Sequence, residues 1–193
     1  MQIEISDFTE VISGYTFRGA IETNENGDVF VLQAKDIVQG KNITDIENLT
    51  PISFLGTRTA SFLQKGDVII VSRGTGVGSF RSVIFNSNNT NVIASSSLLI
   101  LRIKKKEILS EYLSMYLNGK DGQNKILQTV TGSYIQAVSR KKFEEIKISI
   151  PPLQKQQSLI ALQENLKQQE KIQERKRELK QNIVSATLRN LTN

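Results

Sequence analysis

Two residue types are missing from this chain altogether, because its 193 residues include no cysteine and no histidine. Without cysteine there is no disulfide framework, no thiolate nucleophile and no cysteine-based zinc site. Without histidine the commonest general base and metal ligand of proteins is also lost. These absences disfavour most classes of enzyme, and we expect no catalytic residues, no metal and no cofactor.

Long apolar runs are missing as well. No stretch reaches the roughly 18 apolar residues of a membrane-spanning helix, and the N-terminal residues 1–7 lack the basic and apolar regions of a signal peptide. We therefore expect a cytoplasmic protein with no membrane partner. The length suffices for one domain of about 150 residues and one further element.

Positive charge is concentrated in the second half of the chain. Residues 1–100 carry seven Lys or Arg against ten Asp or Glu (net −3), and residues 101–193 carry 18 against nine (net +9), for a total of +6. Basic clusters lie at residues 102–106, 140–142 and 175–177. Such clusters attract polyanions, nucleic acid above all, but they also occur on faces that are merely solvated.

The C-terminal stretch from Leu153 onward contains neither glycine nor proline and consists mainly of good helix formers. Pro151 and Pro152 precede it, and proline suits the first turn of a helix, where its missing N–H would be unpaired anyway. The pattern predicts one helix from Leu153 to Leu191, roughly 55–60 Å long at about 1.5 Å per residue. We expect a domain over residues 1–150 and a helical spacer over residues 151–193.

Apolar residues of this helix gather near its two ends, while its middle is nearly all polar. They are Leu159, Leu162 and Leu166 near the start, and Leu179, Ile183 and Ala186 near the end. A lone helix of this kind is marginal in water unless it packs against something. It either folds back on its own domain, remains a solvated tail, or packs antiparallel against a second copy. We favour the antiparallel pair; the heptad pattern is not sustained enough for a long parallel coiled coil.

The first sixty residues predict short elements joined by polar loops. Residues 3–13 indicate a short helix, or a strand that leads into one, and residues 29–32 a strand. Between them, residues 14–19 interleave two aromatic rings with Arg18. In a loop these residues form a contact surface, and in a core Tyr15 and Phe17 would be buried on alternate sides of a strand. Residues 40–59 are expected to be a connection with little structure.

The clearest β pattern lies between residues 68 and 101. The runs 68–71, 80–85 and 92–101 are rich in apolar residues and are separated by polar loops. Short loops join antiparallel strands, since parallel neighbours need a longer crossover. These three runs therefore predict an antiparallel sheet.

Three glycines, Gly74, Gly76 and Gly78, lie in the loop after the first of these strands. They do not form a dinucleotide-binding fingerprint, because the third glycine comes too early and a strand follows instead of a helix. A P-loop is excluded because its lysine is missing. The loop is better interpreted as a hairpin tip that can approach a ligand closely, for example in a groove of DNA.

The basic half predicts helices before a last strand. Residues 107–118 place apolar side chains on one helical face, residues 125–130 form a second short helix, and residues 139–145 form a third that Ser139 caps. Residues 146–150 form the last strand. These patterns thus combine an antiparallel sheet with short helices in one domain, followed by a long C-terminal helix.

Six stretches, taken in order, carry a further signal. They are Ile12–Arg18, Leu32–Ile37, Lys65–Gly76, Glu111–Leu117, Gly132–Ile135 and Ile146–Gln156. None is decisive alone, but in order and spacing they resemble one half of the specificity subunit of Type I restriction–modification systems, over nearly the whole chain. The resemblance implies the α/β (α+β) class, with a mixed or antiparallel sheet in a target-recognition domain that binds double-stranded DNA, followed by a long helical spacer.

Members of that family usually carry two such domain–helix units, whose helices pack antiparallel so that two domains read the two halves of a split DNA site. This sequence holds one unit. The resemblance implies a half-size subunit that forms a homodimer or pairs with a different half. It also implies that methylation and cleavage belong to partners, the DNA methyltransferase (modification) subunits and a restriction/translocase subunit.

On this interpretation Lys and Arg neutralise phosphates and a few side chains read base edges. By position, the candidate DNA-binding residues are Tyr15, Thr16, Arg18, Lys35, Arg73, Thr75, Ser79, Arg81, Ser133, Tyr134, Gln136, Arg140 and Lys141. The candidate dimerisation residues are the six apolar ones of the helix. A second hypothesis is an assembly or decoy protein that docks on restriction–modification partners through its helix and never contacts DNA. An autonomous enzyme has little support.

Overall fold

The computed structural model of the chain describes residues 2–54, 56, 61–76 and 78–191. It divides into two compact units, Met1–Leu153 and Gln154–Asn193. Residues 55 and 57–59 of the expected connection, and Val77 of the glycine-rich loop, lie outside the described residues.

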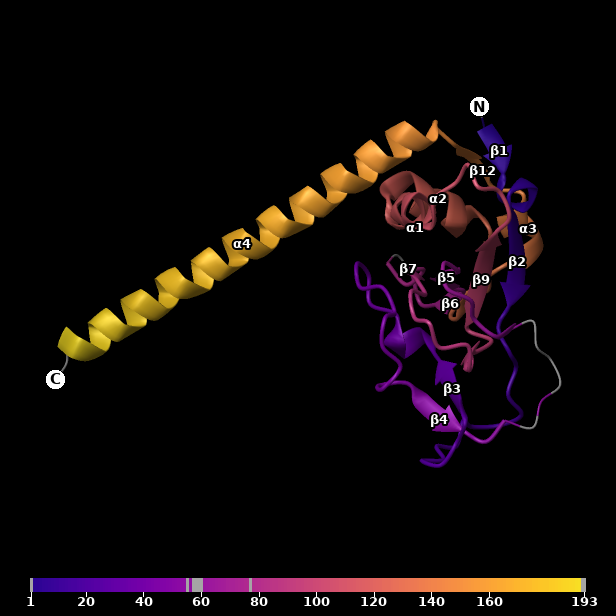
Figure 1. Ribbon diagram of the computed structural model, residues 1–193, viewed down its shortest axis with the longest axis horizontal. Coiled ribbons are helices and arrows are strands. Elements are labelled where there is room, and N and C mark those ends of the chain that lie inside the picture. The colour runs from indigo at the N-terminus through magenta and orange to yellow at the C-terminus, as the bar shows by residue number, and fades with distance from the viewer. Residues whose placement is uncertain (1, 55, 57–60, 77, 192–193) are drawn as a thin grey trace. The chain divides into compact units, whose positions relative to one another are not determined.

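A four-stranded sheet lies at the centre of the first unit. Its strands are β2 (Thr9–Ser13), β9 (Leu98–Ile103), β5 (Val68–Val71) and β7 (Ser82–Ile84), in that order and antiparallel throughout, running from right to left in Figure 1. Successive side chains of a strand point to opposite faces. Val68 and Ile70 accordingly join one hydrophobic core, and Ile69 and Val71 join another. The apolar run 68–71 is therefore a strand that is covered on both faces.

Helices supply the core of the first face. They are η1 (Ile5–Asp7), α1 (Ser110–Asn118), α2 (Lys120–Gln128) and α3 (Arg140–Glu144). Their fully buried residues include Ile5, Leu117, Ile126 and Phe143. Nearby, β1 (Gln2–Glu4) pairs antiparallel with β12 (Lys147–Ser149), so the two ends of this unit are joined.

A three-stranded sheet supplies the core of the second face. In it β3 (Val29–Leu32) lies between β4 (Thr50–Ile52), which is antiparallel to it, and β8 (Val92–Ala94), which is parallel. A third sheet, in the order β10 (Val130–Thr131), β11 (Gln136–Val138) and β6 (Arg73–Gly74), is antiparallel throughout. The mixed sheets confirm the predicted fold class.

The expected strand over residues 92–101 is wrong in one respect, because it is divided between two sheets. Val92–Ala94 pair with β3, and Leu98–Ile103 form the central strand β9. Between them Ser95–Ser97 form a turn, in which the Leu98 N–H donates to the Ser95 carbonyl oxygen at 2.9 Å. The antiparallel sheet is confirmed for the other two runs, which contain β5 and β7.

Two further expectations about the N-terminal half are wrong. For residues 3–13 the alternative of one short helix is wrong. The strand β1 leads into η1, as the other alternative expects, but residues 9–13 are a further strand, because β2 pairs with β9 from Thr9↔Ile103 to Ser13↔Leu99. The connection over residues 40–59 contains the strand β4. Both errors have one cause, since the partner strand that stabilises each segment is distant in the sequence. Among the helices, α2 also begins at Lys120, earlier than expected.

The second unit is the helix α4 (Leu153–Leu191), 39 residues long and drawn as one continuous ribbon in Figure 1. Its bounds are those that the sequence predicts. In the part of the chain that the structure describes, no helix combines the length and apolar character needed to span a membrane.

An ion pair joins β9 to the turn before β5. The Arg102 guanidinium donates from Nε to Oδ1 of Asp67 at 3.0 Å and from Nη2 to Oδ2 at 2.7 Å. The Gln64 N–H donates to the same carboxylate at 2.8 Å, and Arg102 also donates to the Phe62 carbonyl oxygen at 2.9 Å. The hydrogen bond to Asp67 raises the pKa of Arg102. The pair is bidentate and largely withdrawn from solvent.

We predict that Asp67→Asn lowers the free energy of unfolding by about 3 kcal/mol, because the partly buried Arg102 loses its counter-charge. Urea unfolding followed by circular dichroism measures this change. As a control, Glu10→Gln breaks the exposed Lys104–Glu10 pair, whose nitrogen–oxygen distance is 3.7 Å, and should cost less than about 1 kcal/mol. Equal losses in the two variants would contradict the importance assigned to the buried pair.

Candidate nucleic-acid interface

The third sheet brings together two of the segments that contain predicted site residues. In the register of β11 and β6, Gln136 lies opposite Gly74 and Ala137 opposite Arg73. The pairing continues where the Val138 N–H donates to the Ser72 carbonyl oxygen at 2.9 Å. We call residues 72–76, 78 and 79 together with residues 130–138 the ribbon.

One end of the ribbon is the turn between β10 and β11. Gly132 has a φ of +97°, and a Cβ atom there would lie 2.4 Å from the Ile135 carbonyl oxygen. Only glycine fits this position without strain. The turn exposes Ser133, and it leaves Tyr134 84% and Ile135 63% exposed. Two large apolar side chains thus stand in solvent at one tip.

Ile135 was not among the candidates from the sequence. Isoleucine is enriched in strands, so an isoleucine next to residues 136–138 is expected to be a buried strand residue. Only the turn geometry reveals its exposure.

The glycine-rich loop of the ribbon folds back on itself. A Cβ atom on Gly74 would lie 2.1 Å from the Cβ atom of Ser79, so Ser79 occupies the space that this glycine leaves. The Ser79 Oγ accepts a hydrogen bond from the Thr75 N–H at 3.2 Å. Ser79 thus stabilises the loop, while Arg73 and the Thr75 side chain remain exposed.

Arg81 has a different role from Arg73, because it is half-buried. Its Nε donates to the Ile37 carbonyl oxygen at 3.1 Å and its Nη2 to the Ala34 carbonyl oxygen at 3.4 Å. These acceptors lie at the two ends of η2 (Ala34–Asp36). Arg81 therefore fastens the chain after the glycine loop to η2.

The exposed Lys35 lies in the middle of η2. Its neighbour Asp36 accepts a hydrogen bond from the Gln33 N–H at 2.8 Å, and burial raises the pKa of Asp36. The hydrogen bonds of Arg81 hold η2 to the chain segment that follows the glycine-rich loop. The exposed Lys35 is thereby fixed to the segment that continues from the ribbon.

The predicted site residues between Ser133 and Lys141 are divided between the ribbon and α3. Gln136 belongs to the ribbon, and its Oε1 is enclosed and has no hydrogen-bond partner among the described residues. Arg140 and Lys141 belong to α3, which lies against β2 and η1. The Arg140 Nε is 2.8 Å from Glu144 Oε1 on the same helix, and Lys141 is exposed.

The N-terminal candidates lie elsewhere, beside the sheet of β3 and β4. The rings of Tyr15 and Phe17 meet edge to face with centroids 4.8 Å apart, and Phe54 lies 5.0 Å from Tyr15. The expectation that the two rings lie on alternate sides is wrong, because residues two apart in an extended chain share a face. Thr16 and Arg18 are exposed.

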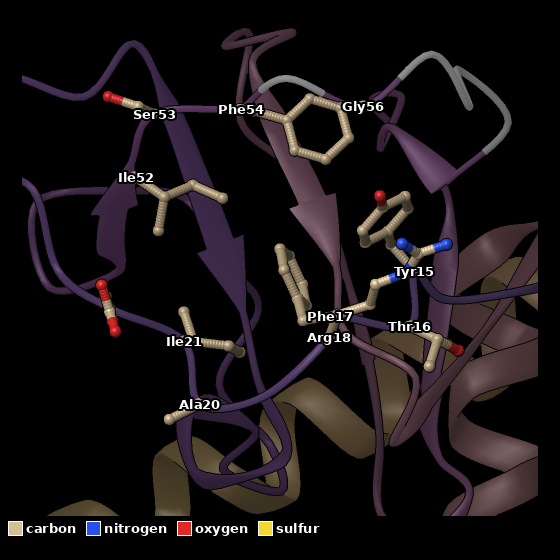
Figure 2. Close-up of a pocket in the computed structure, with 11 residues that line it drawn as sticks. Tyr15, Thr16, Phe17, Arg18, Ala20, Ile21, Ile52, Ser53, Phe54 and Gly56 are labelled. Atoms are coloured by element: carbon tan, nitrogen blue, oxygen red, sulfur yellow. The ribbon is translucent and has the colours of Figure 1, made fainter.

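This aromatic cluster borders a pocket of about 560 Å³. Figure 2 shows the rings of Tyr15, Phe17 and Phe54 around it, with Ile21 and Ile52 on the opposite side. Because the rings are half-buried against Val31 and Ile93, they are both a local core and the wall of a cavity. The structure thus shows Tyr15 and Phe17 packed in a small core, and a contact surface at residues 14–19 stays a prediction.

Both segments of the ribbon come from stretches without carboxylates. No Asp or Glu occurs between Asp67 and Glu107, or between Asp121 and Glu144, whereas Lys and Arg occur in both intervals. A surface built from such stretches attracts anions. Among the described residues, no group of three or more carboxylates lies together as a metal site would require.

The chain matches a known family along most of its length. The family model for the Type I restriction modification DNA specificity domain matches residues 1–181. Among curated protein sequences none matches the chain.

Three solved structures are similar to the chain. The HsdS subunit from Thermoanaerobacter tengcongensis shows a TM-score of 0.60 at 18% identity, over 88% of this chain and 37% of that one. A chain of the structure titled "Structural basis underlying complex assembly and conformational transition of the type I R-M system" shows 0.61 at 17% identity, over 88% and 38%. The S subunit from M. genitalium shows 0.48 at 14% identity, over 77% and 33%. The first two share the fold, and the chain spans between 33% and 38% of the length of all three.

We predict opposite results for two arginines of this region. Arg81→Gln removes the hydrogen bonds to Ile37 and Ala34 and should lower the free energy of unfolding by about 1–3 kcal/mol. Arg73→Gln changes an exposed side chain and should stay within about 0.5 kcal/mol of the wild type. Urea unfolding of both variants measures the difference, and equal stabilities would contradict the fastening role of Arg81.

Proposed function

This chain belongs to the Type I restriction-modification DNA specificity domain family, which confirms the resemblance seen in the sequence, and we propose that it is a non-catalytic DNA-reading subunit. It recognises a double-stranded DNA sequence and directs the methyltransferase and restriction subunits of such a system to it. The observation that carries the proposal is the ribbon, in which the pairing of β6 with β11 joins the segment of Arg73 and Thr75 to the hairpin of Ser133 and Tyr134, both from carboxylate-free stretches.

The side chains of the ribbon have the chemistry of DNA contacts. The exposed Arg73 pairs with a phosphate or with the O6 and N7 of guanine, and the hydroxyls of Thr75 and Ser133 hydrogen-bond to phosphates or base edges. Lys35, Arg140 and Lys141 add phosphate contacts around the ribbon. Arg81 and Ser79 act on DNA indirectly, because their polar groups hold the loop in place.

The N-terminal loop is a second contact segment in this proposal. Thr16 and Arg18 are exposed, and the cluster of Tyr15, Phe17 and Phe54 fixes the backbone that carries them. A cation on a packed loop pays less conformational entropy on binding a phosphate than one on a free loop.

The helix α4 supports a half-size subunit that acts as a pair. Its apolar side chains Leu162, Leu166, Leu179 and Ile183 are 58%, 52%, 47% and 65% exposed. In an antiparallel pair, Leu159, Leu162 and Leu166 of one copy meet Leu179, Ile183 and Ala186 of the other. Two domains then read the two halves of a split site.

We predict that the chain binds a mixed-sequence 30-base-pair duplex with an affinity that falls steeply as salt rises, because phosphate neutralisation releases counterions. Fluorescence anisotropy between about 50 and 200 mM salt measures the slope of log K against log salt. Arg73→Gln should reduce that slope by about one. Lys65→Gln, an exposed cation that contacts Asn88 instead, is the matched control and should leave it unchanged. Absence of binding at low salt would favour the decoy hypothesis.

We further predict that the chain is a dimer in sedimentation velocity and that Leu166→Asp or Ile183→Asp makes it monomeric, because a charge cannot be buried in the apolar contact. Gln168→Asp, on the opposite face of the helix from Leu166, is the matched control and should remain dimeric. Circular dichroism of Gln168→Asp should match the wild type, whereas the monomeric variants should lose part of the helix signal, because a lone helix of this kind is marginal in water. A monomeric wild type would refute the symmetric pair without affecting the DNA-reading role.

A further inference from the structure

We propose that Tyr134 and Ile135 form a wedge that inserts between stacked base pairs and opens one step of the bound duplex. This inference rests on the proposed function and adds to it the manner in which the ribbon engages DNA. It follows from exposure, attachment, charge and size of the ribbon tip.

The exposure of the two side chains is unusual for a folded domain. Tyr134 and Ile135 are exposed and adjacent, and no other pair of neighbouring large apolar residues in the described part of Met1–Leu153 is as exposed. Leaving both in water sacrifices the free energy that their burial would supply. A pair of this kind on a hairpin tip indicates a binding contact.

The tip is also firmly attached, as a wedge must be. Val130 pairs with Val138 and Thr131 with Ala137 on one side, and β11 pairs with β6 on the other. Val138 belongs to the first hydrophobic core. Gly132 provides the tight turn that turns the chain outward. Because β11 is paired on both sides, the hairpin that carries Tyr134 and Ile135 is held to the domain.

The charge near the tip favours an anionic ligand, which in the proposed function is DNA. The wedge lies in the carboxylate-free stretch between Asp121 and Glu144, and the adjacent strand β6 carries the exposed Arg73. Proteins that kink DNA insert apolar side chains between base pairs while neighbouring cations hold the phosphates. Tyr134 supplies a ring that can stack on a base, and Ile135 supplies an apolar edge.

The size of the tip argues against a protein partner. A stable protein interface buries on the order of 800 Å² on each side, whereas only two large apolar side chains stand at this tip. Insertion between base pairs, by contrast, needs only one or two apolar side chains.

The test uses the full chain and a duplex recovered by selection from a random pool. Each adenine in turn is replaced by 2-aminopurine and each guanine by 6-methylisoxanthopterin, both of which brighten when they unstack. We expect one step to brighten on binding. The double variant Tyr134→Ala, Ile135→Ala should abolish the brightening and raise Kd by about 10- to 100-fold. Its salt slope should equal that of the wild type, because no charge is removed.

Two variants serve as matched controls. Tyr134→Phe keeps the ring and should keep the brightening, and Val38→Ala shortens an exposed apolar side chain outside the ribbon and should change neither signal nor Kd. A wild-type complex in which no position brightens overturns the wedge, and so does a double variant that keeps both affinity and brightening. In these two cases DNA binding itself persists. If no duplex is bound even at low salt, the proposed function fails together with the wedge.

Discussion

The burial of the central sheet on both faces is the constraint on which the rest of the structure depends. The strands β5 and β9 contribute side chains alternately to a helix-covered core and to a core covered by the sheet of β3. The Asp67–Arg102 ion pair fixes the turn that leads into β5. Because β5 ends at Val71, directly before the ribbon, and Val138 is anchored in the first core, this packing positions the ribbon on the domain.

Arginine serves three purposes in this fold, and the difference lies in what surrounds it. Arg102 neutralises a buried carboxylate, Arg81 donates to backbone carbonyl oxygens at both ends of η2, and Arg73 faces solvent. The guanidinium group suits all three because it is always charged and donates in fixed directions. Of these three, only Arg73 keeps its donors for a phosphate or a base, which is why the proposed function relies on it for the ribbon.

Apolar side chains also differ in role according to whether they are buried or exposed. Those of the central strands stabilise the domain, those of the aromatic cluster fix the N-terminal loop, and those of α4 and of the ribbon tip remain exposed. In our proposal the exposed ones act in recognition, α4 by pairing two copies and the tip by opening DNA. Scaffold and recognition surface are thus separate sets of residues, so recognition residues can vary without loss of the fold.

The sequence by itself determined the elements whose signal is local. The limits of α4 follow from the prolines at 151 and 152 and the absence of glycine and proline beyond them, and β5 follows from its apolar run. The fold class and the family resemblance could also be predicted. Tertiary structure alone decided that residues 9–13 form a strand, that 92–101 divides between two sheets, and that Arg73 and Gln136 become neighbours while Arg81 is withdrawn. In each of these cases the stabilising partner is distant in the sequence, and a local pattern carries no information about which distant segment will supply the hydrogen bonds.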